Sequence, residues 1–332
     1  MGAFSFDLYQ AAEGFYREFP ARKADTVIAD VNGTADELRA RMRGIFPYAD
    51  RRFPGDMAEW VLRDRSPQVK HLVSDDDGIF RDPDVEDGGQ IDASIILSPA
   101  RAPKDKSFRE SIIRDYFLKR ASLTAHYRNN NIVVPDEPGF DNDDYWLQKV
   151  FDHESAHALF AHDPGARKFG GRGPHFEESV CDAYALIRHY QRFGADTGFD
   201  RALILNRARL IPDMRTPYAR SHMTVACLEA VRAMDRAELM SLSPQQSFDL
   251  AVRVARDHSL SNGLLDDFGN AASESRDLKT ADLARYYAKS ALPPVLVGDY
   301  IDAELTLQPN DTLDRAALEG ARRSLAQTLV LS

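Results

Sequence analysis

The stretch FDHESAHALF, residues 151–160, places two histidines four positions apart, with a glutamate directly after the first. Residues 140–163 around it begin with Asp and Asn residues suited to helix N-cap positions and continue with helical periodicity, which predicts one long helix. At about 100° per residue, His153 and His157 lie within about 40° of each other on this helix. Apolar residues, including Trp146, share their face. We therefore expect both histidines to point into the protein.

Two buried histidines one turn apart each need a polar partner, because buried polar groups are almost always hydrogen-bonded. Ordinary hydrogen bonds within a packed core are one solution. A zinc ion bound through both ring nitrogens is another, and it satisfies the two side chains at once. Glu154 lies about 100° round the helix from His153, which places a carboxylate beside the two histidines.

A catalytic zinc site needs a third protein ligand and leaves its fourth position to water. Glu178, 21 residues beyond His157, is the best candidate. Its predicted helix has an apolar stripe and, on the opposite side, a stripe that contains Glu178, Asp182 and the small Ala185. Such a stripe is usually solvated, but the small residue favours close approach to another helix. Glu177 would point about 100° away from Asp182, so we prefer Glu178.

An HExxH sequence followed about twenty residues later by ExxxD resembles the zinc metallopeptidases of the gluzincin (thermolysin-like) type. The resemblance covers residues 145–190 and, loosely, the order of strands and helices. It implies a catalytic zinc ion, with the following roles: His153, His157 and Glu178 as zinc ligands, Glu154 as general base, and Asp182 as the carboxylate that orients a ligand histidine.

In that family a downstream Tyr and His stabilise the oxyanion of the tetrahedral intermediate. Residues 216–223, TPYARSHM, offer Tyr218, Arg220 and His222 for this role, whereas Tyr184 is expected to pack behind the ligand helix. Residues 91–99, IDASIILSP, alternate as a strand should. This strand is either the sheet edge that pairs with an extended substrate or a plain core strand.

The predicted fold is α+β and helix-rich, with a zincin-like core around a small mixed or antiparallel sheet and an active-site helix. We expect strands at 25–31, 91–99 and 129–136. We divide the chain into a mostly helical N-terminal region (1–88), a zincin-like catalytic core (89–195) and a helical C-terminal subdomain (196–332).

Composition restricts the partners. A net charge of -10 argues against nucleic acid, because phosphate-binding proteins carry basic surfaces. Two cysteines exclude a disulfide framework, and no window approaches eighteen consecutive apolar residues, so we expect no membrane span. The N-terminus lacks a secretory signal pattern, which makes a cytoplasmic location the expectation, although export without a signal leaves no trace in a sequence.

We thus predict a zinc metallopeptidase, an endopeptidase of peptides or proteins, that uses a zinc-activated water. A metzincin is disfavoured because its third histidine would stand at Asp163. Two alternatives stay open: a zinc-stabilised interaction protein without activity, and an HD-type metallophosphohydrolase. The second would use His162 and Asp163 with His126 and Asp182.

Overall fold

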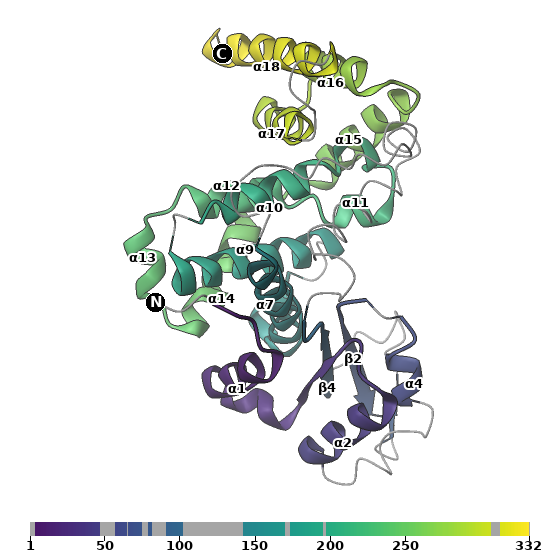
Figure 1. Ribbon diagram of the computed structural model, residues 1–332, viewed down its shortest axis with the longest axis vertical. Coiled ribbons are helices and arrows are strands. Elements are labelled where there is room, and N and C mark those ends of the chain that lie inside the picture. The colour runs from purple at the N-terminus through teal and green to yellow at the C-terminus, as the bar shows by residue number, and fades with distance from the viewer. Residues whose placement is uncertain are drawn as a thin grey trace.

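The computed structural model of the chain combines a small sheet near the N-terminus with many helices (Figure 1). It describes residues 4–46, 57–64, 66–74, 79–81, 91–101, 142–169, 173–194, 197–306 and 313–331. After residue 142 the described elements are all helical. The expected helix-rich α+β fold with a mostly helical C-terminal part is therefore confirmed.

The elements up to the ligand helix are α1 (Leu8–Glu18), the 3₁₀ turn η1 (Pro20–Ala24), β1 (Thr26–Asp30), α2 (Ala35–Ile45), α4 (Met57–Val61), β2 (Gln68–Ser74), β3 (Phe80–Arg81), β4 (Ala93–Ser98), α7 (Asp143–His162), α8 (Pro164–Arg167) and α9 (Pro174–Phe193). The remaining elements are α10 (Phe199–Ala208), the 3₁₀ turn η3 (Ile211–Asp213), α11 (Pro217–Ser221), α12 (Val225–Arg232), α13 (Arg236–Ser241), α14 (Pro244–His258), α15 (Asn262–Glu274), α16 (Thr280–Lys289), α17 (Pro294–Leu305) and α18 (Leu313–Leu331).

The sheet has the strand order β1-β4-β2-β3. β1 runs parallel to β4, whereas β2 is antiparallel to both β4 and β3, so the sheet is mixed. The strands at 25–31 and 91–99 are confirmed, and the strand expected at 129–136 lies outside the described residues. β4 stands between β1 and β2, which makes it a core strand and not the edge that meets a substrate.

Strand β2 was not expected from the sequence, because the lysine and histidine in QVKHLVS hide its alternation. Val69 packs with the core that contains α7, and Leu72 packs on the opposite face of the sheet. Between them, the ammonium group of Lys70 lies 5.1 Å from the ring centroid of Trp60. The aliphatic stem of such a lysine can cover apolar surface while its charge stays near water.

The sheet separates two apolar cores. Ile28 and Ile96 face the larger core with α7, while Val27 and Ile95 face the smaller one with α2 and α4. Figure 1 shows α2 and α4 on the side of the sheet away from α7. Strands from both sides of residue 88 share this sheet, and the three-part division of the chain stays a prediction.

Helices α7 and α9 pack against each other in the middle of the molecule (Figure 1). The Asn142 side chain caps α7 by accepting a hydrogen bond from the Tyr145 N–H. Gly173 precedes α9 with a φ of 84°, a conformation that favours glycine, and Pro174 occupies the first turn. The second stripe of α9 is not solvated: Asp182 and Ala185 are fully buried in the structure.

Within the described residues, no helix has both the length and the apolar character needed to cross a bilayer.

Candidate metal centre

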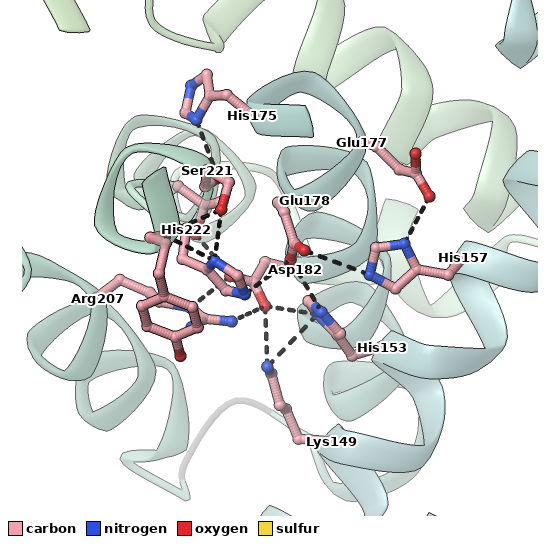
Figure 2. Close-up of polar contacts among 12 residues, drawn as sticks. Lys149, His153, His157, His175, Glu177, Glu178, Asp182, Arg207, Ser221 and His222 are labelled. Atoms are coloured by element: carbon pink, nitrogen blue, oxygen red, sulfur yellow. Dashed lines mark hydrogen bonds and ion pairs between the residues drawn. The ribbon is translucent and has the colours of Figure 1, made fainter. Parts of the chain in front are cut away.

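The two histidines of α7 and the glutamate of α9 form a compact group. His153 Nε2 lies 3.1 Å from Glu178 Oε2, and His157 Nε2 lies 3.6 Å from Glu178 Oε1 (Figure 2). The possible ligand atoms of the three residues all lie within 4.8 Å of one another. In the part of the chain that the structure describes, this is the one group of three such side chains that could hold a metal ion.

Each histidine is oriented by a second carboxylate behind it. His153 Nδ1 is 2.8 Å from Asp182 Oδ1, and His157 Nδ1 is 2.7 Å from Glu177 Oε1. Each carboxylate accepts a hydrogen bond from Nδ1–H, and this tautomer leaves the Nε2 lone pair of each ring directed towards Glu178. The contact of Asp182 with His153 matches the expectation from the sequence.

Glu177 is the supporting residue that the sequence reasoning missed. The sequence suggested Glu177 only as an alternative to Glu178 for the third metal ligand, but Glu177 does not belong to the metal-binding group. Its angular offset from Glu178 directs it to the next turn of α7, where it meets His157 (Figure 2). Consecutive glutamates opposite two histidines one turn apart are the sequence signal that could have indicated this arrangement.

Asp182 connects several elements at once. It is fully buried and accepts two hydrogen bonds from the Arg207 guanidinium, at 2.6 and 2.9 Å. The Thr224 hydroxyl donates a third at 2.6 Å, and the Lys149 ammonium lies 2.9 Å away. Burial alone would raise the pKa of Asp182, but Arg207 and Lys149 outweigh it and hold that pKa well below its usual range. Asp182 is therefore a permanent anion behind His153.

The residues present fit a divalent metal ion. Glu178 Oε2 is buried and has no hydrogen-bond partner among the described residues, although His153 Nε2 lies 3.1 Å away. Carboxylates outnumber the lysine and arginine side chains at the site, which favours a bound cation. The carboxylates belong to Glu154, Glu177, Glu178 and Asp182, and the two basic side chains are Lys149 and Arg207.

A cavity of about 370 Å³ opens beside the group. Glu154 lines it together with the three candidate ligands. Burial raises the pKa of the Glu154 carboxyl, and the neighbouring His153 and His157 counteract part of that shift. The opposite wall comes from the edge of the sheet, with Gln68, Val69 and His71 of β2.

His222 also lines the cavity, with Nε2 3.5 Å from Glu178 Oε2. Its Nδ1–H donates to the Tyr218 carbonyl oxygen at 2.9 Å, and the Tyr218 ring stacks on the imidazole with centroids 4.1 Å apart. Tyr218 itself is 54% exposed and is not among the lining residues. Arg220 forms an ion pair with Asp266 instead.

Tyr184 is buried and packs edge-on against Phe248 of α14, so the expectation that it packs behind the ligand helix is confirmed.

The residues of the phosphohydrolase alternative have other partners. The Asp163 side chain caps α8 by accepting from the N–H groups of Gly165 and Ala166. His162 Nε2 is hydrogen-bonded to the Ser94 hydroxyl at 3.1 Å. His126 lies outside the described residues.

Comparisons with known proteins find no matching family model, no similar curated protein and no similar solved structure. The assignment of the site rests on its own residues.

We expect the protein to bind one divalent ion per chain. His157→Ala removes one of three ligands and should weaken zinc binding more than about 100-fold, since even altering a residue that orients a ligand typically costs 10–100-fold. Competition titration against a zinc indicator measures this. His258→Ala, at an exposed histidine of α14, is the control and should leave the affinity unchanged. Equal affinities of the two variants would contradict the site.

Asp182→Asn should destabilise the fold, because it leaves Lys149 and Arg207 buried without their counter-charge. The free energy of unfolding should fall by about 3–5 kcal/mol. Urea denaturation with a chelator present separates this effect from metal binding. Adding Lys149→Met to the variant should restore part of the loss. Asp282→Asn, which breaks an exposed pair with Arg285, should change stability by less than about 1 kcal/mol.

Proposed function

We propose that this protein is a zinc-dependent peptidase that hydrolyses bonds within peptide or protein chains. The observation that carries the proposal is the His153–His157–Glu178 group on the wall of a cavity that Glu154 also lines. Two histidines and a glutamate are one of the ligand sets of catalytic zinc, and three protein ligands leave a position for water.

The Glu154 carboxylate is placed to move the proton that hydrolysis requires. When bound, zinc lowers the pKa of a coordinated water to about 7 and polarises the scissile carbonyl. Glu154 takes a proton from the attacking water and delivers it to the leaving amine. Its burial supports this exchange, because a raised carboxyl pKa brings the acid and base forms closer in energy near neutral pH.

We assign His222 as the residue that stabilises the oxyanion of the tetrahedral intermediate. Its Nε2 lies 3.5 Å from Glu178 Oε2, while Tyr218 holds the ring by stacking and through its carbonyl oxygen, which accepts a hydrogen bond from Nδ1–H. With Nδ1–H directed at that carbonyl, His222 donates from Nε2 only as an imidazolium, and because burial lowers its pKa to about 4 the ring is neutral before the reaction begins. Negative charge that develops on the substrate oxygen favours this form.

We assign the outer edge of β2 as the surface that binds the substrate backbone. β2 pairs with β4 on one side through residues 68–72, and on the other side the described residues pair with it only at Val73 and Ser74, through β3. The start of β2 lines the cavity, so an extended peptide added along this edge would pass the candidate ligands. Such pairing uses main-chain groups and needs no free terminus, which favours an endopeptidase.

A zinc-stabilised interaction protein is the alternative. Structural zinc sites are closed by four protein ligands, whereas this group offers three ligands and borders a cavity. That difference favours a catalytic over a structural role for zinc at this site.

Glu154→Gln should retain one zinc ion per chain and lose peptide cleavage by about 10²–10⁴-fold, because the amide cannot accept the proton. Metal analysis and a library of quenched fluorescent peptides measure the two properties separately. Glu238→Gln, at an exposed position of α13, is the matched control with full activity. A zinc-loaded wild-type protein that cleaves no peptide of a broad library would contradict the peptidase assignment but not the metal site.

His222→Phe should lower kcat by about 10²–10³-fold, the usual cost of losing an oxyanion donor. Tyr218→Phe keeps both the ring and the backbone carbonyl that hold His222, so its kcat should change less than about threefold. Steady-state kinetics on a cleaved peptide compares the two. A larger loss in Tyr218→Phe would assign the donor to the tyrosine hydroxyl.

A further inference from the structure

His71 presents a polar atom to the cavity from the side of the sheet. It is half-buried on β2, lines the cavity, and lies within the electrostatic reach of Glu177 and His157. Its Nδ1 is 3.0 Å from the Ser94 hydroxyl of β4. Its Nε2 has no hydrogen-bond partner among the described residues.

Ser94 extends this contact through the sheet. Its hydroxyl oxygen is also 3.1 Å from His162 Nε2, and His162 Nδ1 is 3.8 Å from Asp25 Oδ2. Ser94 is fully buried between the two imidazoles. A chain of four polar side chains therefore leads from the cavity wall to Asp25, and the catalytic scheme above uses none of them.

The charge of Asp25 favours one arrangement of protons along these side chains. The carboxylate lies 3.8 Å from His162 Nδ1 and favours a proton there, in which case His162 Nε2 accepts from the Ser94 hydroxyl. The Ser94 oxygen then accepts from His71 Nδ1–H. His71 Nε2 is left as a hydrogen-bond acceptor that faces the cavity. The reverse order would set a bare nitrogen of His162 against a carboxylate.

Glu177 provides a second acceptor in the same cavity. One of its oxygens accepts from His157, and the other has no hydrogen bond within the described part of the chain. Among the described residues, those that line the cavity include the carboxylates of Glu154, Glu177 and Glu178 and no lysine or arginine. A divalent ion at the candidate ligands offsets part of this charge, but Glu177 stays outside the ligand group.

We propose that His71 and Glu177 form a subsite for a basic substrate residue, Lys or Arg, next to the scissile bond. A cationic side chain with several N–H donors satisfies both acceptors, whereas an acidic side chain meets like charge and no donor. This subsite defines the substrate class as peptides with a basic residue next to the scissile bond, and it rests on the peptidase function proposed above.

The test compares peptides that carry Lys or its uncharged isostere norleucine at each position flanking the scissile bond. Zinc-loaded wild-type protein should cleave the Lys peptide at least about tenfold faster in kcat/KM, as a hydrogen bond to a charged group implies. The preference should fall below about threefold in Glu177→Gln and in His71→Phe. The amide oxygen in Glu177→Gln can still accept a hydrogen bond from His157, and with zinc supplied at saturation the variant should bind one ion per chain despite a lower affinity.

Binding provides a measurement that does not depend on turnover. Fluorescence anisotropy with zinc-loaded Glu154→Gln should show the same preference for the Lys peptide. Tighter binding of the Lys peptide without any cleavage by the wild type would support the subsite and contradict the peptidase. Cleavage with equal rates for Lys and norleucine, or a preference that survives both substitutions, would overturn the subsite alone.

Discussion

The site depends on one buried carboxylate, Asp182. It accepts hydrogen bonds from His153 of α7, from Arg207 of α10 and from Thr224 just before α12, with Lys149 as a further cation. An anion without solvent is stable only when such partners surround it. The position of α7 against α9, and the orientation of the first metal-ligand candidate, both follow from satisfying this charge. The same contacts tie the C-terminal helices to the site.

Every side of α7 is covered by other elements, so its polar residues need partners inside the protein. The sheet packs on one side and α9 on another. Buried polar groups of an enclosed helix are stable mainly where they are paired. In α7, Asp152 pairs with Arg192, Lys149 with Asp182, and the two histidines with carboxylates of α9. The candidate metal centre is part of this buried polar network.

The sequence predicted the site better than its surroundings. The helical spacing of His153, Glu154 and His157 places them on neighbouring faces whatever the tertiary structure, and the same holds for Glu178 and Asp182. Helix α2 was likewise predictable from its capping box, since Thr34 and Glu37 exchange local hydrogen bonds. In contrast, β2 was missed, because the positions of Lys70 and His71 depend on Trp60 of α4 and Ser94 of β4, contacts that no local pattern in the sequence indicates.

The sequence by itself determined which side chains share a helix face, because that depends on a local period of 3.6 residues. It thereby specified two neighbouring histidines, the adjacent Glu154, and the pair of Glu178 and Asp182. Only the tertiary structure decided that Glu177 supports His157, that Arg207 and Lys149 neutralise Asp182, and that the wall opposite the ligands comes from β2. These contacts join residues brought together by the packing of helices and by strand order, and no local periodicity encodes such distances.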